Sequence, residues 1–126
     1  MSYTWGSSST DANISAATIT ASSSLASAAI SNSGQAVTEC GLVLTYNTSA
    51  TKGGKVEILR TTDGGTTYQV DADSPFGFNL PFVANTTEHY VFSVPGTISQ
   101  FKVNLINLDT GQSITAATLK VRQATN

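Results

Sequence analysis

The chain has 126 residues and a mass of 13.1 kDa, with a net charge near -2 and only 11% charged residues. A chain of this length builds one hydrophobic core and not two. Its six Lys and Arg residues are scattered and form no patch that neutralises a row of phosphates, so we expect no nucleic-acid partner. No apolar run approaches the ~20 residues of a membrane span, so we expect no membrane partner either.

The first third of the chain is rich in small and hydroxyl side chains. Residues 7–35 are nearly all Ser, Ala, Thr and Asn, and their only large apolar side chains are Ile14, Ile19, Leu25 and Ile30. Their spacing of five or six residues fits neither an amphipathic helix nor a strict strand alternation. We therefore predict an extended Ser/Ala/Thr-rich arm over residues 1–12 and weak edge strands over 13–34, within a single domain of residues 13–126.

From residue 36 onward apolar and polar residues alternate with a period of two, which is typical of strands with one buried face. Between Val37 and Tyr46 the even positions are predicted to face the core. The residues predicted to be buried in this way are Cys40, Leu42, Leu44, Tyr46, Val56, Ile58, Tyr90, Phe92, Val94, Phe101, Val103 and Leu105. The last strand starts in one phase with Ile114 and ends in the other with Leu119, which predicts a bulge near Ala116–Ala117.

Short turn signals separate these strands, such as Asp63-Gly64, Pro95-Gly96 and Asp109-Thr110-Gly111. Close spacing of turns favours hairpins and hence antiparallel pairing. The predicted fold is all-β: a single antiparallel β-sandwich, either immunoglobulin-like or jelly-roll. The order of the strands does not follow from the sequence.

The inventory of reactive residues is small. The single cysteine, Cys40, lies in a predicted buried strand and is expected to be a core residue. The single histidine, His89, is expected on a solvated face, and no Gly-x-Ser-x-Gly elbow accompanies it. We therefore expect no catalytic site, no cofactor and no histidine-rich metal site.

Residues 61–68, Thr-Thr-Asp-Gly-Gly-Thr-Thr-Tyr, resemble the Asp-box hairpin of sialidases and other β proteins, with Tyr68 at the usual Trp position. The motif is structural: the carboxylate accepts backbone N–H bonds and the glycine takes a positive φ. Sialidase catalysis needs three arginines, and this sequence has two, Arg60 and Arg122.

The aspartates near this hairpin are the only metal candidates. Asp71 and Asp73 lie on the same side of a strand end, and Asp63 is expected across the hairpin from them. Carboxylate oxygens are the ligands that Ca²⁺ prefers, so the three form a weak calcium candidate. A solvated turn is the simpler interpretation.

Aromatic side chains are the candidate interface residues. Phe76, Phe78 and Phe82 share one parity of a segment interrupted by prolines, which favours an edge strand. This row of rings either caps the core or forms an apolar patch for a partner. Trp5 on the arm is a second candidate anchor, or folds back onto its own domain.

Residues 54–64, 81–87 and 101–107, together with the Ser/Thr/Ala-rich start, resemble small structural proteins of tailed-phage virions, in particular capsid decoration or cement proteins. The resemblance implies a non-enzymatic, commonly trimeric β protein that binds the major capsid protein outside an assembled shell and reinforces it. It also implies location in the virion. Because Met1–Gly6 has neither the basic nor the apolar segment of a signal peptide, we expect synthesis in the host cytoplasm without such a signal.

Two alternatives remain. The first is a carbohydrate-binding β-sandwich that uses Tyr68, Tyr90 or Phe76 as a stacking platform for sugar rings. The second is a neck, tail or fibre component of a phage.

Overall fold

The computed structural model describes residues 3–71 and 75–126, and this part of the chain contains strands and no helices. No segment of it is a helix long and apolar enough to cross a membrane. The strands are β1 (Thr4–Trp5), β2 (Ser9–Thr10), β3 (Ala17–Ile19), β4 (Ser24–Ala26), β5 (Ile30–Ser31), β6 (Val37–Tyr46), β7 (Gly54–Arg60), β8 (Gly77–Asn79), β9 (Thr87–Pro95), β10 (Gln100–Asn107) and β11 (Ile114–Thr125).

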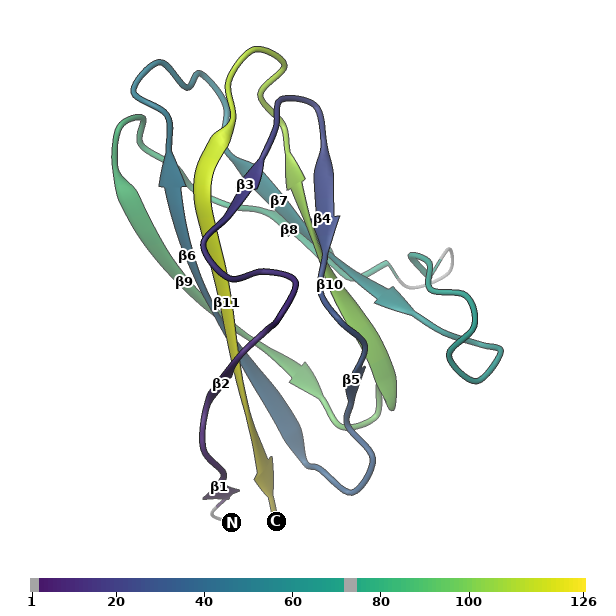
Figure 1. The fold of residues 1–126 in the computed structure, drawn as a ribbon. Coiled ribbons are helices and arrows are strands. Elements are labelled where there is room, and N and C mark those ends of the chain that lie inside the picture. Colours follow the sequence, from purple (N-terminus) through teal and green to yellow (C-terminus); the bar gives the residue numbers. More distant parts are fainter. Residues whose placement is uncertain (1–2, 72–74) are drawn as a thin grey trace.

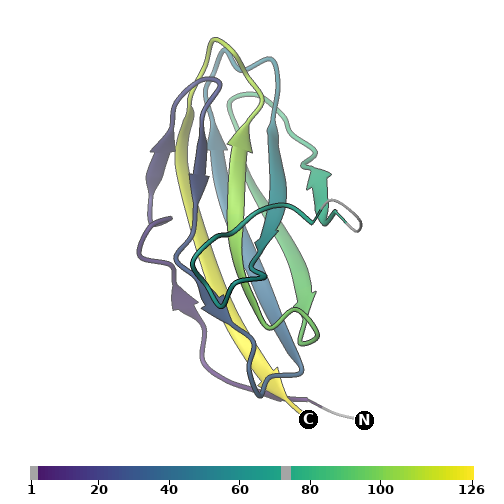
Figure 2. The ribbon, with the colours of Figure 1, turned by 90° about the vertical axis from the view of Figure 1, so that its right-hand side faces the viewer.

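The strands form two antiparallel sheets, which confirms the predicted β-sandwich (Figure 1). In the six-stranded sheet, β11 and β6 are central, β9 is one edge, and the short strands β1, β2 and β3 follow one another along the other edge. In the five-stranded sheet, β10 and β7 are central, β8 is one edge, and β4 and β5 share the other. The long strands run along the length of the molecule and most connections lie at its two ends, whereas the β7–β8 connection crosses its side (Figure 2).

The strand order is that of a jelly roll. The short strands β1–β3 act as one interrupted strand, and so do β4–β5, which leaves eight strands in chain order. The first of these, β1–β3, pairs with the last, β11, and β4–β5 pairs with β10. β6 then pairs with β9, and β7 pairs with β8. These nested antiparallel pairs form one long hairpin, which rolls up so that β11 also pairs β6 and β10 also pairs β7. The structure thereby selects the jelly roll from the two predicted topologies.

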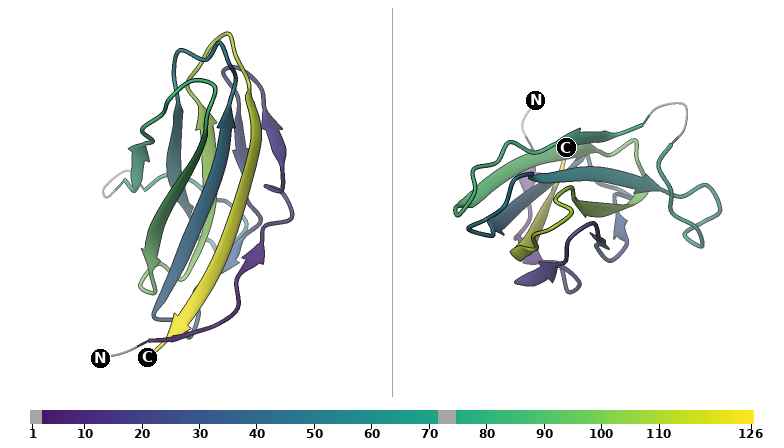
Figure 3. Two further views of the ribbon diagram at one scale, coloured as in Figure 1. Left: turned by 90° about the vertical axis from the view of Figure 1, so that its left-hand side faces the viewer. Right: turned by 90° about the horizontal axis from the view of Figure 1, so that it is seen from above.

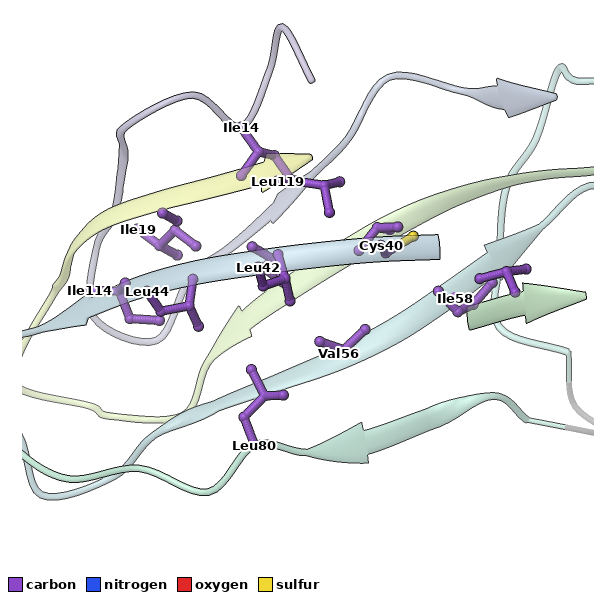
Figure 4. Close-up of a cluster of buried hydrophobic side chains, with 14 of the residues drawn as sticks. Ile14, Ile19, Cys40, Leu42, Leu44, Val56, Ile58, Leu80, Ile114 and Leu119 are labelled. Atoms are coloured by element: carbon purple, nitrogen blue, oxygen red, sulfur yellow. The ribbon is translucent and has the colours of Figure 1, made fainter. Parts of the chain in front are cut away.

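The core lies between the sheets and follows the predicted alternation. The even residues of β6 from Cys40 to Tyr46 are buried, as are the inward residues of β7 and β10. Figure 4 shows several of these side chains, with Leu42 and Leu44 of β6 across from Val56 and Ile58 of β7. Burial raises the pKa of the Cys40 thiol to about 12, so Cys40 is the inert core residue that its position predicts.

The N-terminal segment is part of the sandwich. Trp5 pairs with Ala124 and Thr10 pairs with Lys120, so residues predicted as an arm are extended but lie along β11 of the same chain (Figure 3). Ile14 and Ile19, which follow them, are fully or almost fully buried at 0% and 2% exposure. The side of the core next to β11 is therefore closed by the segment with the fewest apolar residues.

The predicted bulge is confirmed close to its predicted position. The register between β11 and β6 shifts between Ile114 and Ala116, and the register with β3 shifts between Ile114 and Ala117. The shift turns Ala117 and Leu119 inward, and both are fully buried. Without it, the second half of β11 would present its apolar side chains to solvent.

Buried polar side chains tie the connections together at both ends of the sandwich. At one end the carboxylate of Asp109, in the β10–β11 turn, accepts N–H bonds from Thr51 (2.7 Å) and Lys52 (3.2 Å) of the β6–β7 connection. It also accepts N–H bonds from Gly111 and Gln112 in its own turn. The Asp109 side chain therefore joins two connections that each cross from one sheet to the other.

At the other end the amide nitrogen of Asn32 donates to the carbonyl oxygens of Pro95 (3.2 Å) and Ile98 (3.0 Å). The hydroxyl of Thr38 on β6 donates to the Asn32 side-chain oxygen, and Gln123 of β11 donates to Thr38 (2.9 Å). Asn32 and Thr38 are buried and every side-chain donor and acceptor buried in the described part of the chain has a partner. Such satisfied networks fix the relative position of the sheets.

Asp109 gives the fold a dependence on acid. The backbone N–H donors of Thr51 and Gly111 hold the pKa of Asp109 far below its ordinary value of 3.8. A depressed pKa in the folded state means that the charged carboxylate stabilises the fold above about pH 4, and that this contribution is lost as the pH falls below that value. Asp63, whose pKa the N–H of Thr67 lowers to about 2, acts in the same window.

We therefore expect Asp109→Asn to lower the thermal midpoint by about 5 °C at pH 7, because the amide group presents a donor to other donors. Its midpoint should also fall less between pH 4 and pH 2 than that of the wild type. Thermal unfolding followed by circular dichroism measures both effects. Glu57→Gln, which removes only a surface ion pair with Lys55, is the control and should change little. Equal midpoints for wild type and Asp109→Asn at pH 7 would contradict the assignment.

Candidate interaction surface

Two exposed aromatic rings and an ion pair form a cluster on the outer face of the six-stranded sheet, and we call these four residues the Trp5 patch: Tyr3, Trp5, Glu39 and Arg122. Tyr3 is 49% exposed and Trp5 is 37% exposed. The guanidinium carbon of Arg122 lies 4.3 Å from the centre of the Trp5 ring, and the Tyr3 ring meets the Trp5 ring edge-on at 6.1 Å. Nε of Arg122 donates to Oε1 of Glu39 at 2.9 Å.

Strand pairing positions the patch. Arg122 of β11 is the direct register partner of Glu39 of β6, so opposite charges stand side by side on one face of the sheet. Trp5 of β1 is the register partner of Ala124, two residues along from Arg122 and on the same face. The Arg122 guanidinium therefore lies over the Trp5 ring, and the cation covers one face of it.

The composition of the patch is that of an interaction hot spot. Trp, Tyr and Arg are the three residues most enriched where truncation weakens protein interfaces. Nε of Arg122 is engaged with Glu39, whereas its two terminal amino groups meet no protein acceptor within the described residues. A planar guanidinium with free donors binds carboxylates and carbonyl oxygens in a bidentate way.

A shallow hollow of about 270 Å³ adjoins the patch. It lies over Gly41, where a Cβ atom would touch nothing nearer than a backbone oxygen at 3.9 Å. Its rim carries both basic and acidic side chains, and its lining residues are Ser8, Glu39, Gly41, Lys120, Val121 and Arg122. The missing side chain at Gly41 therefore leaves space beside the Glu39–Arg122 ion pair.

A larger groove of about 630 Å³ runs along the side of the sandwich, between the edge strands β2 and β5. Six of its thirteen lining residues are Ser, Thr or Ala, two are the apolar Ile30 and Val121, and the charged or amide residues are Asp11, Gln35, Arg122 and Gln123. Asp11 accepts N–H bonds from Asn13 (2.9 Å) and Ala28 (3.3 Å), and Gln123 donates to the Ser31 carbonyl oxygen. These two polar groups hold the edges of the two sheets together.

Comparison with known proteins finds similarity in fold only. No protein-family model and no curated protein matches the chain. Among solved structures it is similar to dimeric latent PorU from Porphyromonas gingivalis, with a TM-score of 0.53 and 10% identity over 100% of this chain and 13% of that one. It is also similar to a chain in the structure of infectious bursal disease virus, Gx strain, with a TM-score of 0.54 and 12% identity over 99% of this chain and 32% of that one.

A third similar structure is BpGH86A, a β-porphyranase of glycoside hydrolase family 86 from the gut bacterium Bacteroides plebeius, with a TM-score of 0.50 and 17% identity. That match covers 94% of this chain and 21% of the enzyme. The chain spans less than a third of each of these proteins. Identities this low show a shared β-sandwich fold and nothing of activity.

The structure places the predicted interface residues in two different environments. Phe76, Phe78 and Phe82 are half-buried and pack against the core, and Phe78 meets Phe92 edge-on at 5.3 Å. The intervening Pro75, Gly77, Asn79 and Pro81 are exposed, as the alternation predicts, and β8 is an edge strand. Of the four candidates, Trp5 therefore has the most open surroundings.

The calcium candidates are engaged in other interactions or lie outside the described residues. Oδ1 of Asp63 accepts N–H bonds from Thr66 (3.1 Å) and Thr67 (2.8 Å), as in an Asp-box turn, and Gly64 and Gly65 have positive φ. Asp71 forms an ion pair with Arg60 at 3.2 Å. Asp73 lies outside the described residues. Within those residues no three His, Cys, Asp or Glu side chains are grouped so that they could hold a metal ion.

The rings named for sugar binding are covered or engaged. Nζ of Lys102 lies 4.7 Å from the centre of the Tyr68 ring. The Tyr90 hydroxyl bonds the Tyr46 hydroxyl at 2.9 Å and donates to the Pro81 carbonyl oxygen, and burial raises its pKa. Phe76 packs against the core, and His89 is exposed on β9.

Glu39 and Arg122 were not predicted as site residues. Nothing in the sequence tells that the strands of these two residues are neighbours. Once the jelly-roll order is known, the opposite charges at register-paired positions are a clear signal.

The stacked arrangement predicts the effect of removing its cation. Arg122→Ala should lower the free energy of unfolding by about 1 kcal/mol, because it removes one exposed cation–π contact and one surface ion pair. Arg122→Lys should lower the free energy of unfolding by a smaller amount, since the positive charge remains but the planar group that stacks on Trp5 is lost. Urea unfolding measures both. Lys120→Ala, on the same strand and exposed, is the control and should change the free energy by less than about 0.5 kcal/mol; an equal loss in the control would contradict the stack.

Proposed function

We propose that the chain is a non-enzymatic structural protein that attaches through the Trp5 patch to the outer surface of an assembled phage capsid. The observation that carries the proposal is the patch itself. It combines exposed Trp and Tyr rings with an arginine whose terminal donors are free, on a sheet whose backbone is fixed by pairing on both sides of β11. A pre-ordered hot spot loses little conformational entropy on binding.

The sequence resemblance to capsid decoration proteins supports this choice among binding roles. The jelly roll is compatible with it, since this architecture is common in viral capsid and lectin domains, and one similar fold belongs to the structure of infectious bursal disease virus. The partner would be the major capsid protein, and the protein would be located on the virion. A neck, tail or fibre position in the same particle uses the same kind of surface.

The mechanism would be linkage between attachment and assembly. A protein that binds the assembled shell and not its free subunits stabilises the shell by RT ln(1 + [L]/Kd) at each site. No chemical step is required. The trimer implied by the resemblance stays a prediction.

Carbohydrate binding is the second candidate, and one observation favours it. Trp5 and Tyr3 are partly exposed aromatic rings, and the neighbouring Glu39 and Arg122 line a hollow with charged and hydroxyl side chains; aromatic and polar side chains of these kinds are found in sugar-binding sites. The platform for sugar would then be Trp5, in place of Tyr68, Tyr90 or Phe76.

Attachment is tested with Trp5→Ala and phage capsids assembled without this protein. The variant should bind such capsids at least about tenfold more weakly in co-sedimentation, since Trp hot spots contribute about 2 kcal/mol or more. Val83→Ala, which truncates a 59% exposed side chain outside the patch, is the matched control and should bind as the wild type does. Equal binding by Trp5→Ala and wild type would exclude the patch as the attachment surface.

A glycan array with the same three proteins separates the two functions. Capsid binding without glycan binding supports the structural role. Glycan binding that Trp5→Ala abolishes, with no capsid binding by the wild type, would replace it by carbohydrate recognition.

A further inference from the structure

The edge strand β9 is nine residues long and pairs with another strand on one side only. It pairs with β6 from Val37–Pro95 to Thr45–Thr87, and no strand of the described residues pairs with its other side (Figures 1 and 3). No backbone hydrogen bond outside that ladder involves residues 87–95 as donors. The open side of β9 is therefore a template for another strand.

The hydrogen-bond alternation identifies the groups that face outward. The carbonyl oxygen of Gln123 accepts the Gly6 N–H, and the N–H of Leu119 donates to the Ile14 carbonyl oxygen. The backbone N–H and C=O groups of the odd residues of β11 are therefore directed to the N-terminal segment and away from β6. The backbone groups of the even residues of β11 then form hydrogen bonds with the odd residues of β6. The backbone groups of the even residues of β6 consequently form hydrogen bonds with β9. The bond from Tyr46 N–H to Thr86 C=O at 3.0 Å agrees with this direction.

It follows that Glu88, Tyr90 and Phe92, the partners of even β6 residues, direct their N–H and C=O groups to β6. His89, Val91 and Ser93 direct theirs to the open edge. The side chains of these last three residues are also exposed, and Val91 at 70% is the most exposed of the large hydrophobic residues.

The other edges of the sandwich are protected. The edge beyond β11 consists of strands of two or three residues, interrupted by Ala16 with a φ of 48°. β8 has three residues and lies between Pro75 and Pro81. β4 and β5 are equally short. Short strands, prolines and irregular backbone are the usual protection against edge pairing, and β9 has none of them before its last residue.

We propose that β9 pairs with β9 of a second copy of this chain, antiparallel and about a twofold axis at Val91. Val91 is the midpoint of Thr87–Pro95, so this register alone overlaps the two strands along their whole length. It is also a register in which the outward N–H and C=O groups of Val91 bond those of Val91 in the other copy, and those of His89 bond those of Ser93.

The side chains suit this self-pairing. Val91 lies opposite Val91, which removes from water on both copies the most exposed large hydrophobic side chain of the described residues. Tyr90 lies opposite Phe92 on the inner face, a favourable aromatic pair. Glu88, the only acidic residue of β9, lies opposite Val94, so no like charges face each other. The twofold axis is perpendicular to the sheet and puts both Trp5 patches on one face of the pair.

The test is the mass of the protein in solution by size-exclusion chromatography with light scattering, from low micromolar to millimolar concentration. The wild type should reach twice the 13.1 kDa of one chain and dissociate on dilution. Val91→Lys, which sets two cations opposite each other, should raise the dissociation constant about tenfold or more. Thr62→Lys places the same charge on an exposed residue of the β7–β8 connection, outside the sheet that contains β9, and should leave the constant unchanged.

Two further measurements keep the proposal falsifiable if Val91→Lys is poorly folded. Val91→Cys should form a disulfide-linked pair on mild oxidation and Val83→Cys should not, while the buried Cys40 takes no part. The amides of His89, Val91 and Ser93 should exchange with solvent more slowly as the wild-type concentration rises. A monomer at all concentrations, a mass of three chains, open-ended growth, or equal dimers of both lysine variants would each overturn the proposal.

Discussion

The pairing of the N-terminal segment with β11 is the constraint on which the rest of the sandwich depends. Without it, the central strand β11 would be an edge, and the core would be open on that side. Ile14 and Ile19 close the core there, and the Asp11 carboxylate reaches across to the backbone of Ala28 on the edge of the other sheet. A stretch of Ser, Ala and Thr suffices because the main chain supplies the pairing and small side chains fit against the neighbouring strand.

The same pairing creates the Trp5 patch. Trp5 is held on the sheet because β1 pairs with β11, and Arg122 reaches its ring because both project from one face. The opposite edge of the six-stranded sheet is different. Its edge strand β9 is long and regular, and no other strand of the described residues pairs with its outer side. The fold thus has one side closed by its own N-terminal residues and one side suited to pairing with another chain, with the Trp5 patch on the outer face between them.

Much of this fold follows from the sequence, and the failures have physical causes. The alternation from Cys40 to Tyr46 and from Phe101 to Leu105, and the phase change in β11, predicted the buried faces and the bulge because each strand is long enough to show its period. β1 to β5 have two or three residues each, too few for a period to be visible. Glu39 and Arg122 lie 83 positions apart in the sequence, so only the strand order, a property of the whole chain, brings them together.

The chain contains a single tryptophan, so its fluorescence reports on the N-terminal segment alone. The most direct test of the account is urea unfolding followed on one sample by Trp5 fluorescence and by far-ultraviolet circular dichroism. If β1 is an integral part of the sandwich, both signals change in one transition with the same midpoint. Loss of the native Trp5 signal at a clearly lower urea concentration, while the strands remain folded, would contradict it and show that the segment is a separate arm.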